Sequence, residues 1–288
     1  MSRIFEALRK TEGQLGEVAK AVLADEALPA RAAHPAAAPE SPSTPVEDPP
    51  AVPGDVRSET IELRPDSPML PFDGSDERAA EQYRIIRTKI QNHPSHPRVL
   101  LVSSPMPGDG KTISAVNLAA SLSLQEDLRV LLLDCDFRRS TATSLLGLTG
   151  TPGLVQVLRN EASVESSLVR IAQFPNLYVL PPGAAWAGAA ELLATARWQS
   201  LLETFRSEFG FVVIDAPPVG TVAEYELLQL ACDGIILVAR QDHTNRQLWR
   251  RALETVPKTK HLGVILNCAE PWFLWKTHSY YYYSGEGR

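Results

Sequence analysis

Several features that define large classes of proteins are scarce in this chain. Its 288 residues include three cysteines, Cys135, Cys232 and Cys268, with no Cys-x-x-Cys spacing. This argues against a disulfide-stabilised secreted domain and against a cysteine-ligated metal site. No apolar run approaches the ~18 residues of a membrane-spanning helix, and a net charge of −6 argues against a broad basic surface for nucleic acid. We therefore expect a cytoplasmic protein with reduced cysteines that does not bind nucleic acid.

The N-terminal quarter has the composition of an arm followed by a linker. Residues 1–25 carry apolar side chains at helical spacing and predict an amphipathic helical arm. Its apolar stripe consists of Ile4, Leu8, Leu15, Val18 and Val22. The balanced charges of the arm favour docking on a partner protein over binding to a membrane surface. Residues 26–75 predict a disordered linker, because Leu28–Pro71 holds eleven of the 23 prolines and few large apolar residues.

A folded domain is expected over residues 76–270, followed by a tail at residues 271–288. From Arg98 onwards, apolar runs alternate with helical patterns, which predicts an α/β fold with a parallel sheet and helices on both faces. The expected strands are residues 99–102, 129–133, 176–180, 211–214, 234–239 and 262–266. The expected helices are residues 76–91, 112–124, 153–159, 222–231 and 244–256, with two more near Glu191 and Ser200.

A Gly-rich turn between a strand and a helix predicts a phosphate-binding loop. Val99–Val102 is an unbroken apolar run, which is typical of a strand buried on both faces. The candidate nucleotide-binding residues of the turn are Pro107, Gly108, Asp109, Gly110, Lys111 and Thr112. Glycines let backbone N–H groups approach phosphate oxygens, the lysine can reach the β- and γ-phosphates, and the threonine hydroxyl can bind Mg²⁺. The strict pattern has glycine at the position of Pro105, so the match departs there.

Carboxylates follow two other apolar runs. Asp134, Asp136 and Arg138 alternate after one run, and Asp215 ends another. If the extended conformation continues, the side chains of Asp134, Asp136 and Arg138 project to one side. Because ligands bind beyond the carboxyl ends of the strands in open α/β sheets, we expect the carboxylates to converge on the Gly-rich loop. Hard carboxylates beside a polyphosphate suit Mg²⁺, so the sequence predicts a nucleotide–Mg²⁺ site.

Two further charged or polar clusters lie outside this site. Glu81, Arg84 and Arg87 form Glu-x-x-Arg-x-x-Arg on a predicted helix. They form either an intrahelical ion pair or an intermolecular ion-pair surface, and the spacing does not choose between the two. The C-terminal tail contains four of the chain's seven tyrosines in a row, Tyr280, Tyr281, Tyr282 and Tyr283. As phosphorylation sites they would add roughly −6 to −8 charge units.

Taken together, these motifs resemble those of the bacterial tyrosine kinases (BY-kinases) of capsule and exopolysaccharide synthesis, over roughly Asp76–Arg288. The resemblance includes a Walker A loop, Ser-Ser-Pro-Met-Pro-Gly-Asp-Gly-Lys-Thr, and a Walker A′ motif, Asp-x-Asp-x-Arg, at Asp134. It also includes a Walker B motif, Asp-x-Pro-Pro, at Asp215 and the C-terminal tyrosine cluster. The motif at Glu81 matches the family's self-association helix. The resemblance implies a P-loop NTPase fold of the ParA/MinD-like type.

The resemblance also implies a reaction and roles for the site residues. ATP with Mg²⁺ would phosphorylate protein tyrosine, with Tyr280–Tyr283 of neighbouring copies as autophosphorylation sites. Lys111 would neutralise charge on the transferred phosphoryl group, and Thr112, Asp136 and Asp215 would hold Mg²⁺ directly or through water. Asp134 would accept the proton of the attacking tyrosine, although the division of roles between Asp134 and Asp136 stays open.

The expected partners also follow from the resemblance. They are a membrane adapter of the polysaccharide copolymerase type that recruits the kinase to the inner face of the membrane, further copies of the chain in a ring, and a protein-tyrosine phosphatase. The alternative is a ParA/MinD-like positioning ATPase, a class with a second lysine where this chain has Met106 and without a tyrosine tail. A third possibility is a nucleotide-binding adapter without activity.

Overall fold

The computed structural model describes residues 56–63, 67–138, 141–148, 152–184 and 186–269. The predicted helical arm, most of the predicted linker and the tyrosine cluster therefore lie outside the described residues. In the part of the chain that is described, no helix is both long enough and apolar enough to cross a membrane.

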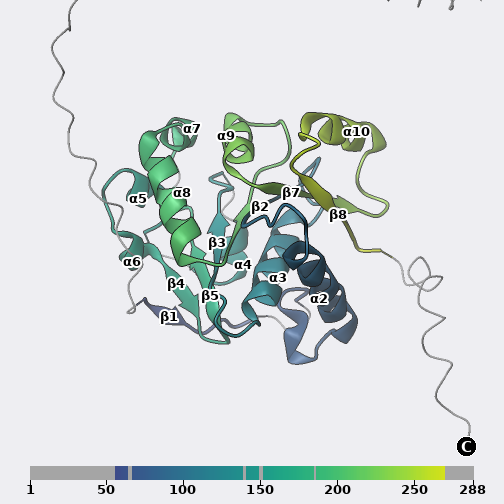
Figure 1. Ribbon diagram of the computed structural model, residues 1–288, viewed down its shortest axis with the longest axis horizontal. Coiled ribbons are helices and arrows are strands. Elements are labelled where there is room, and N and C mark those ends of the chain that lie inside the picture. The colour runs from purple at the N-terminus through teal and green to yellow at the C-terminus, as the bar shows by residue number, and fades with distance from the viewer. Residues whose placement is uncertain (1–55, 64–66, 139–140, 149–151, 185, 270–288) are drawn as a thin grey trace, which may run out of the picture. The chain divides into compact units, whose positions relative to one another are not determined.

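An eight-stranded sheet organises the described residues (Figure 1). The strands are β1 (Ser58–Glu59), β2 (Val99–Ser103), β3 (Val130–Asp134), β4 (Val169–Ile171), β5 (Phe174–Leu180), β6 (Phe211–Asp215), β7 (Gly234–Arg240) and β8 (His261–Asn267). Their order across the sheet is β1-β4-β5-β3-β6-β2-β7-β8. The strand that leads into the Gly-rich loop, β2, is therefore flanked by β6 on one side and by β7 on the other.

Helices form most of the connections between the strands. They are α2 (Glu77–Gln91), α3 (Lys111–Ser123), α4 (Thr141–Leu145), α5 (Leu154–Leu158), α6 (Val164–Ser167), α7 (Ala189–Leu193), α8 (Ala196–Glu208), α9 (Ala223–Ala231) and α10 (Arg246–Thr255), with a short 3₁₀ helix η1 (Pro71–Asp73). The helices expected from the sequence over residues 76–256 are present, with small shifts at their ends. The short helices α4 and α6 were not expected.

Strand β2 is buried on both faces, as its unbroken apolar run predicts. Leu100 and Val102 pack in one core with residues of α3, whereas Val99 and Leu101 pack in a second core with residues of α8 and α9. Successive strand residues point to opposite faces, so helices on both faces are needed to cover them. Each fully buried side chain of this kind contributes roughly 1.5–3 kcal/mol, and the two cores together position β2 and the loop after it.

The sheet is parallel except at one pair of strands. Strands β4 and β5 run antiparallel, because only Ala172 and Gln173 separate them. A two-residue connection can reverse the chain but cannot make the crossover that parallel strands need. No strand is expected from the sequence at the position of β4, so this antiparallel edge of the sheet is apparent only in the structure.

The structure also differs from the sequence analysis at the end of the predicted linker. Strand β1, which lies inside the linker prediction, pairs with β4, and Ile61, Met69 and Leu70 are buried. The backbone N–H of Leu70 donates to the Asn117 side chain on α3 at 2.7 Å. The folded part therefore begins before residue 76, because the apolar residues of this Pro-containing segment pack against the sheet and α3.

A half-buried ion pair between Arg206 and Asp233 holds the beginning of β2 in place. The Asp233 carboxylate accepts both Arg206 guanidinium N–H groups, at 2.9 and 2.8 Å, and the backbone N–H groups of Arg98 and Val99, at 2.9 and 2.8 Å. Burial opposes the charge on Asp233, but the bonds from Arg206 and from the two backbone groups lower its pKa below the ordinary value of 3.8. This carboxylate joins α8, β2 and the start of β7.

We predict that Asp233→Asn lowers the free energy of unfolding by about 1–2 kcal/mol at pH 7, after allowance for partial solvent screening. A carboxylate with a lowered pKa stabilises the fold above its unfolded-state pKa and loses this contribution as the pH falls through its folded-state value. The difference between variant and parent should therefore be constant between pH 5 and 7 and shrink below pH 3.8. Denaturant unfolding at several pH values measures it.

The matched control is Glu203→Gln. Glu203 also pairs with Arg206, at 3.4 Å, but its side chain is 75% exposed. An exposed pair contributes about 0–1 kcal/mol, so this variant should unfold nearly as the parent does. Equal losses from the two variants would contradict the role given to Asp233.

Candidate functional site

The carboxyl ends of three adjacent strands bring polar groups together at one edge of the sheet. Asp134 at the end of β3 pairs in register with Asp215 at the end of β6, and Asp215 pairs with Val102 of β2. The Gly-rich loop follows β2 at the same edge (Figure 1). The convergence that the sequence analysis expected from strand topology is therefore present in the structure.

The Gly-rich loop has the backbone geometry of a phosphate cradle. Gly108 and Gly110 adopt φ values of +87° and +95°, in a region that glycine occupies without strain. Gly110 directly precedes α3, so the N–H groups of the first turn and the positive end of the helix dipole face the loop. Pro105 is buried and leaves both glycine conformations in place. The arrangement suits an anion with several oxygens.

Lys111 lies at the centre of the site. Its Nζ donates to Asp136 Oδ2 at 3.0 Å and lies 3.4 Å from Asp215 Oδ1 and 3.3 Å from Thr112 Oγ1. All four side chains are buried. Burial opposes the charge of the ammonium group, but attraction to Asp215 and Asp136 outweighs it and raises the pKa of Lys111 above 10.5.

Two carboxyl groups at this site, those of Asp215 and Asp134, have pKa values above the ordinary value of 3.8. Burial raises the pKa of Asp215 to about 7; the Lys111 charge opposes the change and Asp134 adds to it. Burial also raises the pKa of Asp134, against hydrogen bonds from Thr143 and Asp136. Cys135 lies between Asp134 and Asp136 in the sequence, and its thiol is fully buried. This burial raises the pKa of the thiol well above 9.0. Cys135 is a core residue with a free thiol.

Thr143 on α4 is a partner of the site that the sequence did not reveal. Its backbone N–H and its hydroxyl both donate to Asp134 Oδ2, at 3.0 and 2.8 Å. The other oxygen of Asp134 accepts the backbone N–H of Asp136 at 3.3 Å. Asp134 is thus held in one orientation by hydrogen bonds that offset part of the cost of burying its charge, while Asp136 faces Lys111.

One buried atom shows how a cation would fit. Among the described residues, Asp215 Oδ2 is buried without a hydrogen-bond partner, which is costly unless a ligand occupies the space beside it. No group of three or more His, Cys, Asp and Glu side chains in the described ranges forms a metal site by itself. A hard cation such as Mg²⁺ needs only one or two carboxylates when phosphate and water complete its shell. The residues therefore fit Mg²⁺ bound together with a polyphosphate.

Comparison with known proteins identifies the family to which this chain belongs. A family model described as "AAA domain" matches residues 98–261. The tyrosine-protein kinase CpsD of Streptococcus agalactiae is 31% identical over 193 residues, which cover 66% of this chain and 83% of that protein. The chain belongs to the bacterial tyrosine-kinase family.

The solved structures agree with membership of the tyrosine-kinase family. The kinase domain of VpsO is similar with a TM-score of 0.60 and 28% identity, covering 69% of this chain and 99% of that one. The cell division ATPase MinD of Pyrococcus furiosus has a TM-score of 0.50 and 26% identity, covering 59% and 71%. The P-loop fold is thus common to both classes, and the similarity to the kinases extends over more of this chain.

Arg138, the last residue of the Asp-x-Asp-x-Arg motif, does not join the two aspartates. Strand β3 ends at Asp134, so the extended conformation assumed in the sequence analysis does not continue. The Arg138 side chain is 69% exposed, and its guanidinium lies 3.8 Å from Glu224 Oε1 on α9. In this member of the tyrosine-kinase family the arginine therefore links the loop after β3 to α9.

The Glu-x-x-Arg-x-x-Arg motif lies on α2, and its members differ in their contacts. Glu81 and Arg84 form an exposed ion pair at 3.0 Å along the helix. Arg87 instead donates to the backbone carbonyl of Ser121 on α3 at 2.8 Å. The intrahelical interpretation therefore holds for the first pair, while Arg87 anchors α2 to its neighbour.

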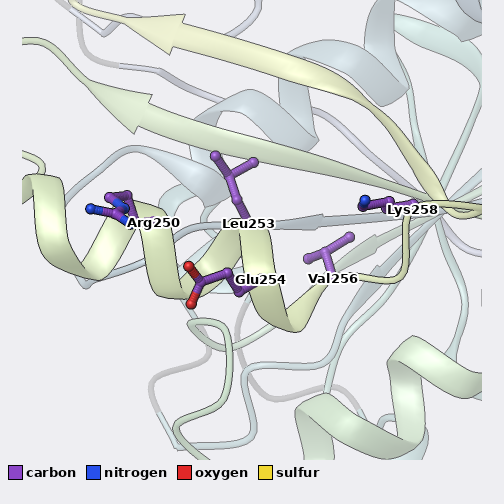
Figure 2. Close-up of a pocket in the computed structure, with 5 residues that line it drawn as sticks. All are labelled: Arg250, Leu253, Glu254, Val256 and Lys258. Atoms are coloured by element: carbon purple, nitrogen blue, oxygen red, sulfur yellow. The ribbon is translucent and has the colours of Figure 1, made fainter. Parts of the chain in front are cut away.

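The described part of the chain also has a pocket away from this cluster. It is lined by Arg250, Leu253, Glu254, Val256 and Lys258 (Figure 2). These residues belong to the C-terminal half of α10 and the segment after it. None of the residues that line this pocket belongs to the cluster around Lys111.

We predict that Asp215→Asn becomes more stable relative to the parent as the pH rises, in the absence of nucleotide and Mg²⁺. A carboxyl with a raised pKa favours folding below its unfolded-state pKa of 3.8 and loses this contribution as the pH rises to about 7. Asparagine does not titrate, so the difference in unfolding free energy should grow by roughly 1 kcal/mol per pH unit and level off above neutrality. Denaturant unfolding between pH 5 and 8 measures it.

The control for removal of a carboxylate is Asp127→Asn, at an exposed loop position where φ is +60°. Its difference from the parent should not follow the same pH profile. A flat profile for Asp215→Asn would show that Asp215 is ionised in the folded protein throughout this range.

Proposed function

We propose that this protein is an ATP-dependent protein-tyrosine autokinase that converts ATP and protein tyrosine to ADP and protein phosphotyrosine, with the tyrosine cluster of neighbouring copies as substrate. The observation that carries the proposal is Lys111 placed among Asp136, Asp215 and Thr112 at the end of a P-loop. Phosphoryl transfer depends mainly on positioning and on neutralising charge, and this cluster supplies both.

Each residue of the cluster has a role in this proposal. The backbone of Pro107–Gly110 cradles phosphate oxygens, and Lys111 moves its hydrogen bonds from the carboxylates to the transferred phosphoryl group. Thr112, Asp136 and Asp215 hold Mg²⁺ directly or through water. Bound Mg²⁺ would neutralise charge that develops on the phosphates.

A proton acceptor for the attacking tyrosine hydroxyl completes the site. Asp134 is the candidate, because its raised pKa gives it a higher proton affinity than an ordinary carboxylate. The pairing of Asp136 with Lys111 gives Asp136 an electrostatic role instead. Thr143 holds Asp134 in place through its two hydrogen bonds.

The described tyrosines support the choice of the tail as substrate. Tyr225 is fully buried and donates to Gln229 at 2.9 Å. Tyr83 and Tyr178 are partly buried and pack edge-on against Phe72 and Phe209. Phosphorylation of any of these would require local unfolding. Tyr280, Tyr281, Tyr282 and Tyr283, in a polar segment, are the better substrates.

We predict that purified protein incubated with ATP and Mg²⁺ becomes phosphorylated on tyrosine, and that Lys111→Met lowers the rate by about a hundredfold or more. Replacing all four tail tyrosines by phenylalanine should remove most of the label and leave nucleotide binding unchanged. Anti-phosphotyrosine detection and mass spectrometry measure both effects. Lys258→Met, at an exposed lysine remote from the cluster, is the control.

The outcomes separate the competing functions. ATP hydrolysis without phosphotyrosine would indicate a positioning ATPase, and nucleotide binding with neither reaction would indicate an adapter. Phosphate found mainly on Tyr83, Tyr178 or Tyr225 would contradict the assignment of the tail as substrate.

We also propose that copies of the chain associate in a ring through α2. A head-to-tail contact closes into a ring when its rotation allows, and phosphorylation between neighbours then needs no folding back of the tail. Glu81 and Arg84 are exposed and available for exchange with a neighbouring copy. One exposed ion pair contributes about 0–1 kcal/mol, so apolar contacts from Ile86 on the same helix would have to add to it.

We predict that Glu81→Ala/Arg84→Ala forms smaller particles by light scattering and has reduced tyrosine phosphorylation. Arg78→Ala, at another exposed arginine of α2, is the control and should change neither property. Arg87→Ala is tested apart, because loss of its bond to Ser121 weakens the attachment of α2 to α3. An unchanged mass and unchanged phosphorylation in the double variant would show that the ring does not use this pair.

The remaining parts of the proposal rest on the family resemblance. A membrane adapter of the polysaccharide copolymerase type would recruit the kinase to the inner face of the membrane. The apolar stripe of residues 1–25 offers a second contact, and tethering would raise the effective concentration of the kinase there. A protein-tyrosine phosphatase would reverse the modification, and the cycle would regulate exopolysaccharide or capsule production.

A further inference from the structure

A carboxylate inside the P-loop does not serve the cluster around Lys111. Asp109 is fully buried, and its Oδ1 accepts the Thr244 hydroxyl at 2.7 Å and lies 3.0 Å from His243 Nδ1. Its Oδ2 accepts the backbone N–H of Met106 at 3.2 Å. A negative charge this close to bound phosphate would oppose binding unless its hydrogen-bond partners compensate it, as they do here.

The glycines of the P-loop are packed from the same side. A β-carbon on Gly108 would lie 3.3 Å from the His243 side chain, and one on Gly110 would overlap the side chain of Asn267. The Asn267 amide also donates to the backbone carbonyl of Asp109 at 3.0 Å. The P-loop therefore rests directly on His243 and Asn267, which lie far from it in the sequence.

These contacts come from the two strands that follow β2 across the sheet. His243 and Thr244 lie in the turn between β7 and α10, and Asn267 ends β8 (Figure 1). The turn is itself closed by two hydrogen bonds: Thr244 Oγ1 accepts the backbone N–H of Arg240 at 2.7 Å, and the Thr244 N–H donates to the Arg240 carbonyl at 3.0 Å. The Lys111 cluster lies on the opposite side of the loop, toward β6 and β3.

We propose that Asp109, His243 and Thr244 are positioning residues that hold the P-loop in its phosphate-binding conformation before nucleotide arrives. The proposal rests on the nucleotide site of the proposed function and deepens it. A P-loop that is always in the binding conformation binds nucleotide with its full intrinsic affinity. If only a fraction of the molecules has the loop in this conformation, the apparent affinity is reduced by that fraction. Once nucleotide is bound, the phosphates themselves order the loop.

This logic gives the positioning residues a distinct kinetic signature. Loss of the Thr244 hydroxyl should weaken nucleotide binding and raise KM for ATP, with little effect on kcat. Loss of the Lys111 ammonium group, which acts on the transferred phosphoryl group, should lower kcat as well. A purely structural role of Thr244 would reduce the fraction of active protein and leave KM unchanged.

The test uses the full chain with Thr244→Val, which keeps the shape of the side chain and removes the hydroxyl, and Thr244→Ser, which restores it. Titration with a fluorescent ATP analogue and Mg²⁺ should show about 5–20-fold weaker binding for Thr244→Val and binding within twofold of the parent for Thr244→Ser. Thr255→Val is the control, since the Thr255 hydroxyl donates along α10, to the Arg251 carbonyl at 2.9 Å.

The outcomes decide the proposal in either direction. Unchanged affinity in Thr244→Val, or failure of Thr244→Ser to restore it, would overturn the proposal. If Thr244→Val does not fold, His243→Ala replaces it and should weaken binding at least threefold; binding equal to the parent would overturn the proposal. The affinity measurement does not depend on kinase activity, so absence of phosphotyrosine would count against the proposed function alone.

Discussion

The site depends on one buried cation surrounded by carboxylates. Lys111 contacts Asp136 and Asp215, and Asp134 lies beside them with its charge met by hydrogen bonds from Thr143 and from the Asp136 backbone. Buried charges are costly without partners, so the lysine that we propose to bind phosphate also compensates the acidic residues when no ligand is bound. The raised pKa of Asp215 shows that this compensation is incomplete. A bound cation would complete it, which links the electrostatics of the fold to the proposed reaction.

The P-loop separates two groups of side chains with different tasks. Toward β6 and β3 it meets the carboxylates and Lys111, and toward β7 and β8 it rests on His243, Thr244 and Asn267. This division follows from the strand order, which places β2 between β6 and β7. Chemistry and preorganisation can therefore be altered separately, as a KM-against-kcat comparison would detect.

Much of the fold is readable from local patterns. Val99–Val102 and Phe211–Ile214 are apolar without interruption and form central strands, and the helical periodicity of residues 76–91 and 112–124 marks α2 and α3 within a residue or so. The failures occur where the local signal is weak. β4 is three residues long and β1 has two, so neither is long enough for an alternating pattern to mark it, and both are defined by the strands they pair with.

The sequence by itself determined the chemistry of the site: the glycines and Lys111 of the loop, the acidic residues after two buried runs, and the family that these motifs share. These signals are local, because a loop, a strand end or a motif is read from consecutive residues. The tertiary structure alone decided which groups surround them. Arg138 pairs with Glu224, Arg87 with Ser121, and Asp109 with His243 and Thr244. Each of these pairings joins residues far apart in the chain, so only the packing of strands and helices brings them within bonding distance.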